Sequence, residues 1–261
     1  MRTRQKLRES LAAGKVLGGM IQFIGHPLMN ELMAAAGADF VIIDMEHSAV
    51  DLERVGQMIF AADAAGVTPF VRIPLVDPAL IGRLLNAGAA GIVLPHATRE
   101  SATALVRAVR YSPDGIRGAC PMVRSKNFTR GNWADYAARE NREVMAIPMI
   151  EDKASLDDFE AMAAIPGLNP LMIGATDLAI ALGVSEATSW DDPKMAAALE
   201  SVVATARRHG KQVMCGIGKK LDLEAGRRVV ARGVQLLIYG TDCDLFMDGL
   251  HRITAVKPPA P

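Results

Sequence analysis

The chain has 261 residues, half of them hydrophobic, and its 29 basic residues balance 29 acidic residues to a formal net charge of +0. This length fits one large domain with a sizeable core, and the balanced charge argues against a nucleic-acid partner or an anionic membrane surface. No apolar run is long enough to span a bilayer, and the basic N-terminus lacks the apolar segment of a signal peptide. The three cysteines, Cys120, Cys215 and Cys243, have no C-x-x-C spacing. We therefore expect reduced thiols in a cytoplasmic protein.

Short β-rich runs alternate with longer stretches rich in Ala and Leu, beginning with a helix from Arg2 that we expect to cover the base of a barrel. Eight strands are predicted near 17–22, 40–44, 68–73, 91–94, 144–150, 170–173, 212–215 and 235–239. Each is followed by a candidate helix, which indicates parallel βα units. This pattern predicts a single α/β domain over residues 1–261, a (β/α)8 TIM barrel with an extra N-terminal helix. A doubly wound open sheet is the alternative, and the count of eight favours the barrel.

Two segments do not follow this alternation of strands and helices. Residues 111–143 form a long polar stretch that contains several arginines, Trp133 and Tyr136. Excursions of this length in a compact domain are usually lids or interface elements. The tail over about residues 254–261, with its Pro-rich end Lys257–Pro261, is expected to be disordered.

Titratable residues stand where several of the predicted strands end. Asp44, Glu46 and His47 follow the second strand, Arg72 ends the third, and Glu151 and Asp177 follow the fifth and sixth. Because the loops after the strands build the active site of an α/β barrel, these side chains are expected to converge on one rim. A charge at such a position is costly unless a partner compensates it.

Glu151 and Asp177 are the candidate metal ligands. Two carboxylates without a nearby His or Cys suit a hard cation such as Mg²⁺ or Mn²⁺, with water and substrate in the other positions. In the alternative interpretation, Glu151 pairs with Lys153 or an arginine and Asp177 caps the following helix. From spacing alone, the two interpretations are about equally favoured.

Arg72 and His47 are the other candidates for chemistry. The Arg72 guanidinium can hold a carboxylate or a carbonyl, although an ion pair with Asp44 or Glu46 is the alternative. His47, among acids, can act as a general base or serve structure alone, and His96 is a second histidine at a strand end.

Two further signals are weaker. No lysine lies inside an apolar strand run, Lys153 being the nearest, which argues against a Schiff base. Gly216-Ile217-Gly218-Lys219 follows the seventh strand, where many barrels bind phosphate, but the signal is short and a plain turn is favoured.

Several segments together resemble one family. These are Asp39–His47, which contains an (I/V)D-x-E-H signature; Phe70-Val71-Arg72 with Asp77-Pro78, similar to VR…DP; Leu84–Ala89, similar to LDAGA; Tyr111–Gly118, similar to Y-P-P-x-G-x-R-G; Ile150-Glu151, similar to QIE; and Gly174–Leu178, similar to G-P-x-D-L. In order and spacing, from about Gly14 to Gly249, the chain resembles the HpcH/HpaI aldolases, class II pyruvate aldolases of the phosphoenolpyruvate/pyruvate-type barrels.

The resemblance implies a metal-dependent cleavage of a 4-hydroxy-2-oxo acid to pyruvate and an aldehyde, and the reverse addition. It implies Glu151 and Asp177 as ligands of a divalent cation, Mg²⁺ or Mn²⁺ with Co²⁺ as a further candidate. Arg72 would hold the 2-oxo oxygen, and His47 would be the base. Backbone groups of the Ala175–Asp177 segment would bind the substrate carboxylate.

The chain departs from the family's pattern at two positions. Asn86 stands where the family usually has Asp, so we expect it to orient His47 without supplying charge, a task that Asp44 or Glu46 could take over. Met149 stands where the family often has Gln, and we expect it to present an apolar wall to the substrate.

The family also implies a homo-oligomer, a hexamer built as a trimer of dimers, with the last barrel helix packed on a neighbouring subunit. Two alternatives to the aldolase are a CoA-thioester lyase of the citryl/malyl-CoA type and a ketoacid-binding protein without catalysis.

Overall fold

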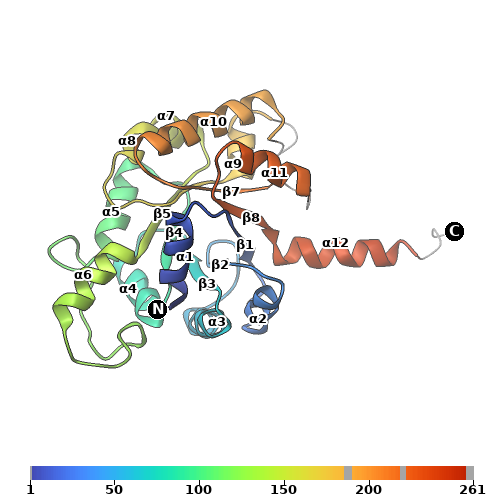
Figure 1. Ribbon diagram of the computed structural model, residues 1–261. Helices are drawn as coiled ribbons and strands as arrows, with labels where there is room; N and C mark the ends of the chain where they lie inside the picture. Colours follow the sequence, from blue (N-terminus) through green and yellow to red (C-terminus); the bar gives the residue numbers. More distant parts are fainter. Residues whose placement is uncertain (1, 185–189, 218–221, 257–261) are drawn as a thin grey trace.

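Eight parallel strands close into a barrel in the computed structural model, which describes residues 2–184, 190–217 and 222–256 (Figure 1). Each strand pairs with the next along the chain, and β8 pairs with β1. The strands are β1 (Leu17–Gln22), β2 (Phe40–Asp44), β3 (Thr68–Arg72), β4 (Gly91–Leu94), β5 (Met145–Ile150), β6 (Leu171–Ile173), β7 (Val213–Gly216) and β8 (Leu236–Thr241). The predicted (β/α)8 TIM barrel is confirmed, and the doubly wound open sheet is excluded.

Helices surround the barrel and fill the connections between strands (Figure 1). They are α1 (Arg2–Ala12), α2 (Leu28–Ala35), α3 (Leu52–Ala65), α4 (Pro78–Ala87), α5 (Arg99–Val109), α6 (Trp133–Glu143), α7 (Lys153–Asp157), α8 (Phe159–Ala163), α9 (Ala175–Ala181), α10 (Pro193–Arg208), α11 (Leu223–Ala231) and α12 (Asp242–Thr254), with a short 3-10 helix, η1 (Arg124–Lys126). Gly66 and Gly88 end α3 and α4 in the left-handed conformation that glycine adopts most readily.

The predicted N-terminal helix is present as α1 and closes the base of the barrel. Its Leu7 and Leu11 belong to the same apolar cluster as Leu17 and Phe40, which are buried inside the barrel. Apolar side chains thus fill the end of the barrel where the strands begin. An active site is expected at the opposite end, where the strands finish.

The segment 111–143 lies at the base as well. Arg124 donates to Asp63 at 2.7 Å and to the Ala87 carbonyl at 3.1 Å, and both acceptors belong to the last turns of α3 and α4. Those turns face the ends where strands begin. The prediction of a lid is therefore wrong for this segment, and an interface element stays a prediction.

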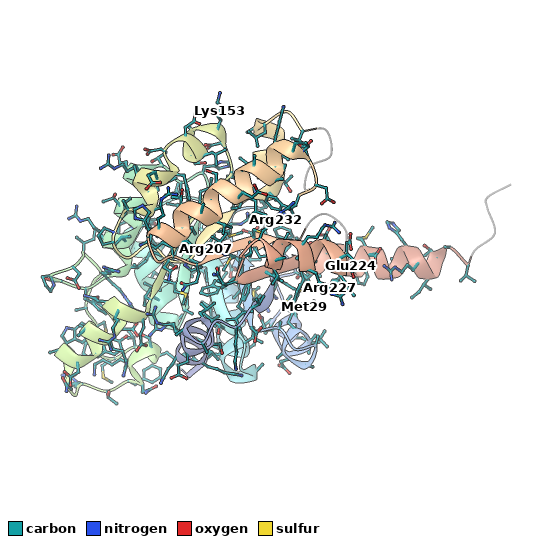
Figure 2. The ribbon with its side chains drawn as sticks, turned by 45° about the horizontal axis from the view of Figure 1, so that its top comes forward. Met29, Lys153, Arg207, Glu224, Arg227 and Arg232 are labelled. Carbon is teal, nitrogen blue, oxygen red and sulfur yellow. The ribbon has the colours of Figure 1, made fainter. Side chains whose placement is uncertain are left out.

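The last helix, α12, projects away from the barrel in both views (Figures 1 and 2). It continues through Thr254, so the expected disordered tail does not begin at that residue. Lys257–Pro261 lie outside the described residues. Among the helices that are described, none is at once long and apolar enough to cross a membrane.

Candidate functional site

Strand alternation explains how titratable side chains reach the barrel mouth. Successive side chains of a strand point to opposite faces, so Phe40 and Ile42 of β2 and Phe70 of β3 fill the barrel interior. Ile42 is level with Phe70, and one inward position further along, Asp44 is level with Arg72. The apolar layer is thus capped by an ion pair at the end where the strands finish.

Arg72 is held by two carboxylates. Its Nε donates to Asp44 Oδ1 at 2.8 Å, and its Nη1 lies 3.2 Å from Glu46 Oε2. Asp44 is fully buried and also accepts the backbone N–H groups of Glu46 and His47. The alternative role of Arg72, an ion pair with Asp44 or Glu46, is observed with both residues, and within the described residues these contacts leave Nη2 without a protein partner.

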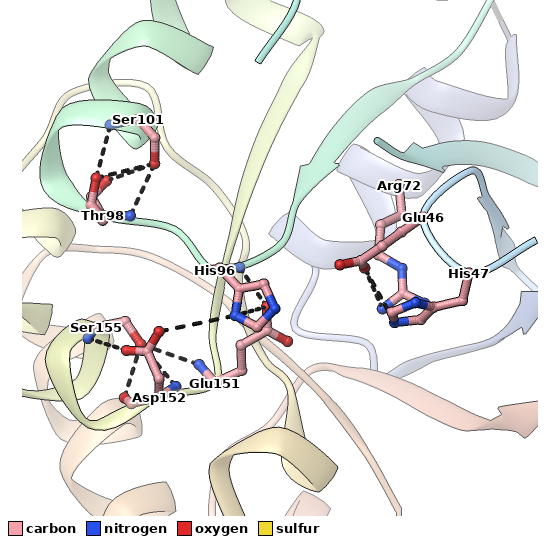
Figure 3. A network of polar contacts seen from close by, with 9 residues as sticks. All are labelled: Glu46, His47, Arg72, His96, Thr98, Ser101, Glu151, Asp152 and Ser155. Atoms are coloured by element: carbon pink, nitrogen blue, oxygen red, sulfur yellow. Dashed lines mark hydrogen bonds and ion pairs between the residues drawn. The ribbon is translucent and has the colours of Figure 1, made fainter. Parts of the chain in front are cut away.

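Glu151 is a second buried carboxylate at this end of the barrel, with 2 % of its surface exposed. Its Oε1 accepts the backbone N–H of His96, whose ring Nδ1 lies 3.5 Å away (Figure 3). Burial raises the pKa of the Glu151 carboxyl, the His96 contacts oppose that shift, and the negative charge of Asp177 adds to it. A buried carboxyl whose pKa is raised in this way is a candidate for function.

Gly174 makes room for this carboxylate. A Cβ atom at position 174 would lie 2.3 Å from Glu151 Oε2, a distance no side chain tolerates. The Gly174 N–H donates to the Ile150 carbonyl at 3.0 Å, which ties the end of β6 to the end of β5. Any larger residue at this position would displace Glu151.

One cavity of about 290 Å³ gathers most of the predicted residues. It is lined by the candidates Arg72, Met149, Glu151, Ala175, Thr176 and Asp177. An apolar wall beside them is formed by Met172 of β6, Ile238 of β8 and Ile21 of β1. The cavity therefore combines convergent charged groups with a hydrophobic surface, as small-molecule sites do.

His47 lies at the rim of the site and does not line this cavity. Its side chain is 58 % exposed, and its Nε2 lies 3.6 Å from Glu46 Oε2, on the same side as Arg72 (Figure 3). His47 thus lies in the loop after β2, whose backbone N–H groups donate to Asp44. Its neighbour in that loop is Glu46, whose carboxylate also contacts Arg72.

Asn86 does not line this cavity, and within one subunit it lies at the other end of the barrel from His47. Its role in orienting a His47 imidazole stays a prediction, which in an oligomer would involve a neighbouring subunit. Asn86 lies in the last turn of α4, where its Oδ1 accepts from Arg117 Nη2 at 3.1 Å. The helices of a barrel run back toward the ends where strands begin. Asn86 precedes β4 by a few residues whereas His47 follows β2, so the two residues occupy opposite ends of the barrel.

The contact of His96 with Glu151 is not predicted by the sequence. The backbone of His96 has φ of 44°, a left-handed conformation that is uncommon outside glycine. This conformation accompanies the backbone hydrogen bond to Glu151. The strand-end position of His96 is visible in the sequence, but nothing in the sequence specifies its main-chain conformation.

The residues present fit a divalent cation held by two protein ligands. Glu151 and Asp177 line one cavity, and in the described ranges no group of three or more His, Cys, Asp or Glu side chains is placed to hold an ion. Asp177 makes no capping bond to α9, and Lys153 is exposed and directed outward (Figure 2), so the alternative roles in helix capping and in pairing with Lys153 are not observed. Of the weak phosphate candidate, Gly218 and Lys219 lie outside the described residues.

Comparison with known proteins agrees with this geometry. Residues 23–248 match the family model described as HpcH/HpaI aldolase/citrate lyase. The chain belongs to the HpcH/HpaI aldolase/citrate lyase family. It is 30% identical over 249 residues to the 5-keto-4-deoxy-D-glucarate aldolase of Citrobacter koseri, covering 95% of this chain and 94% of that protein.

Two solved structures have the same fold. An HpcH/HpaI aldolase from Desulfitobacterium hafniense DCB-2 is 29% identical, with a TM-score of 0.88 over 98% of this chain and 99% of that one. The citrate synthase SbnG is 31% identical, with a TM-score of 0.83 over 96% of each chain. The family and the relatives named as aldolases indicate a lyase of the aldolase kind.

Proposed function

We propose that this protein is a class II aldolase that cleaves a 4-hydroxy-2-oxo acid to pyruvate and an aldehyde and catalyses the reverse addition. The observation that carries the proposal is the buried Glu151 carboxylate, which shares one cavity with Asp177 and Arg72. Membership in the HpcH/HpaI family supports the same chemistry.

Glu151 and Asp177 would hold the divalent cation, Mg²⁺, Mn²⁺ or Co²⁺. When bound, this ion supplies Lewis acidity toward the 2-oxo oxygen of the substrate. Oxygen ligands suit a hard cation, and the charge of the ion would offset the mutual repulsion of the two carboxylates.

Arg72 would donate from Nη2 to the 2-oxo oxygen, where negative charge develops as the enolate forms. Asp44 and Glu46 hold the guanidinium in place, so little reorganisation is needed when that charge appears. Backbone N–H groups of Thr176 and Asp177, with Ala175 beside them, would bind the substrate carboxylate.

His47 would move the proton, with Glu46 Oε2 3.6 Å from its Nε2 to orient the ring. Met149 would contact the substrate through its apolar side chain, since it is buried in the cavity wall beside Glu151.

The protein would act as a homo-oligomer, a hexamer built as a trimer of dimers. α12 leaves the barrel with exposed apolar side chains that include Phe246 (63 %) and Ile253 (71 %). An apolar pocket of about 360 Å³ lies near the strand that precedes α12. It is lined by Leu223 and Val230 of α11 and by Tyr239 of β8. α12 of a neighbouring subunit would cover this face.

Incubation with pyruvate and a panel of aldehydes, with and without EDTA, tests the reaction. We expect 4-hydroxy-2-oxo acid adducts that disappear on chelation and return when the cation is restored. Turnover of CoA thioesters in place of free acids would instead favour the CoA-thioester lyase. Binding of pyruvate without adducts would favour the non-catalytic alternative.

A further inference from the structure

We propose that the site accepts a donor with an alkyl group on C3, such as 2-oxobutanoate, and that Gly216 determines how large this group can be. The inference rests on the function proposed above and adds the chemical class of the donor. In the sequence, Gly216 belongs to the weak phosphate candidate and not to the motifs that resemble the aldolases.

Three methionines form one level inside the barrel. Met149 of β5 is the register partner of Met172 on β6, which in turn is the partner of Met214 on β7. All three belong to the apolar cluster inside the barrel, so their side chains point inward. Met149 and Met172 line the cavity, which therefore has an apolar floor one level below Glu151.

The next inward level is open at Gly216. Two residues beyond the methionines stand Glu151, Gly174 and Gly216, and all three line the cavity. The glycine at 174 makes room for the Glu151 carboxylate. A Cβ at Gly216, in contrast, would find its nearest described atom, the Ile238 carbonyl oxygen, at 3.9 Å, and the φ of Gly216 is not left-handed. Neither the backbone nor a described neighbour requires glycine at this position, so a side chain here would enter the cavity.

Hydrogen bonds fix the end of β7 that carries Gly216. Its carbonyl oxygen accepts the Nε1–H of the buried Trp190 at 2.7 Å, and the Ile217 N–H donates to the Ile238 carbonyl at 3.0 Å. These bonds use main-chain atoms of β7, so a side chain added at position 216 would leave them intact. A wall held in one shape discriminates between ligands of different size better than a mobile one.

The planar geometry of a 2-oxo acid directs C3 toward β8 and β1. With the substrate plane across the barrel mouth, the 2-oxo oxygen would face Arg72 at the end of β3, and the carboxylate would face the start of α9, directly after β6. The three substituents of C2 are spread evenly in one plane, so C3 bisects the wider arc between these two strands. In the closed order β6-β7-β8-β1-β2-β3, the middle of that arc falls between β8 and β1.

The side chains in that direction are apolar. Ile238 of β8 and Ile21 of β1 line the cavity there, and Met172 lies on the adjoining floor. Gly216 is the register partner of Ile238, so the space beside its Cα adjoins this wall. An alkyl group on C3 would move from water onto an apolar surface, which favours its binding.

The aldol reaction takes such a donor without an added step. In cleavage, the C3–C4 bond breaks as the 4-hydroxyl gives up its proton, and the electron pair of the bond becomes the enolate. C3 then takes a proton. A substrate with a methyl group on C3 therefore releases 2-oxobutanoate in place of pyruvate, and addition reverses these changes.

Exchange of the C3 protons for deuterium, followed by NMR with Mn²⁺ present, tests the donor without an aldehyde. We expect wild-type kcat/KM for 2-oxobutanoate to lie within about tenfold of that for pyruvate, and Gly216→Val to lower the 2-oxobutanoate to pyruvate ratio by about tenfold or more, as a methyl-sized change in an apolar pocket does. Gly216→Ala, the milder variant, should fall between the two. Ile21→Ala should enlarge the wall and raise the ratio of 2-oxopentanoate to pyruvate.

Gly82→Val is the matched control, because position 82 lies on α4 outside the cavity and a Cβ there meets no described atom within 4 Å. It should leave the ratio unchanged. A wild-type ratio below about one tenth, or folded Gly216 variants with the wild-type ratio, would overturn the inference. Gly216 variants that change only the preference among alkanals of different length would assign the apolar wall to the aldehyde and overturn its assignment to the donor. Exchange of pyruvate alone would reject this inference and keep the proposed function, whereas exchange of neither acid would reject both.

Discussion

Asp44 and Arg72 are register partners on β2 and β3, and Asp44 Oδ1 lies 2.8 Å from Arg72 Nε. The strand pairing itself thus places the carboxylate against the guanidinium, on the last inward-facing level of the barrel. With Nε bonded to Asp44, the two terminal nitrogens of Arg72 are fixed in direction: Nη1 faces Glu46, and Nη2 is left for the cavity. Arg72 is therefore aimed by the sheet rather than by a flexible loop.

Arg72→Lys should lower kcat by about 100-fold or more, because an ammonium cannot bond Asp44 and the developing enolate charge in the same geometry. The effect on KM should be smaller, since the cation and the backbone of α9 would still bind the ground state. Steady-state kinetics of aldol cleavage measure both parameters. Arg83→Lys, at an exposed position on α4, is the matched control and should be neutral. Equal losses in the two variants would argue against the specific role of Arg72.

Glu151→Gln should abolish activity and at the same time stabilise the protein measured in EDTA. Burial raises the Glu151 pKa above its usual 4.5, so the folded state holds this proton more tightly than the unfolded state does. Wild type accordingly loses stability as pH rises from about 4.5 through the raised pKa, and the loss persists at higher pH. Glutamine carries no such penalty.

The measurement is Tm against pH in EDTA for both proteins. We expect the variant to exceed wild type by a few degrees at pH 8 and the difference to shrink toward pH 4. A difference that does not change with pH would contradict the assignment of the penalty to ionisation of Glu151.

Asn86→Asp tests whether position 86 acts on His47. Within one subunit position 86 contacts Arg117 at the base of the barrel and not His47 at its mouth, so coupling inside a single barrel predicts an unshifted pH profile of kcat/KM. His47→Ala, in contrast, should lower activity across the profile. Both profiles are measured on one aldol substrate. A shifted acidic limb in Asn86→Asp would mean that Asn86 of one subunit is coupled to His47 of another, since the two lie at opposite ends of one barrel.

The outcome at these residues shows what the sequence could predict. Strand positions follow from short apolar runs, and alternation then brings Arg72, Met149 and Glu151 to one cavity, so their convergence was predictable. The role of Asn86 is predicted from a motif and not from its place at the end of a helix, and the topology of one barrel separates it from His47. The left-handed backbone of His96 depends on tertiary packing against Glu151 and has no local signal.

Phe246→Glu should shift the protein from a homo-oligomer toward smaller species. Phe246 is 63 % exposed on α12, and a buried charge in an apolar interface would be costly. Light scattering coupled to size exclusion gives the mass, and Arg252→Glu on the same helix is a control for charge alone. A wild type that is monomeric at micromolar concentration would contradict the proposed assembly.

The most direct test of the proposed chemistry is the exchange of pyruvate C3 protons with deuterium, followed by NMR. In the proposed mechanism exchange would require only the cation, Arg72 to stabilise the enolate and a base, so it would isolate the half-reaction built around Glu151 and Asp177. We expect wild type to exchange these protons with Mg²⁺ or Mn²⁺, to stop in EDTA and to recover when the cation is restored, while Glu151→Gln and Asp177→Asn fold but do not exchange. Full exchange in EDTA, or in either folded variant, would contradict the account.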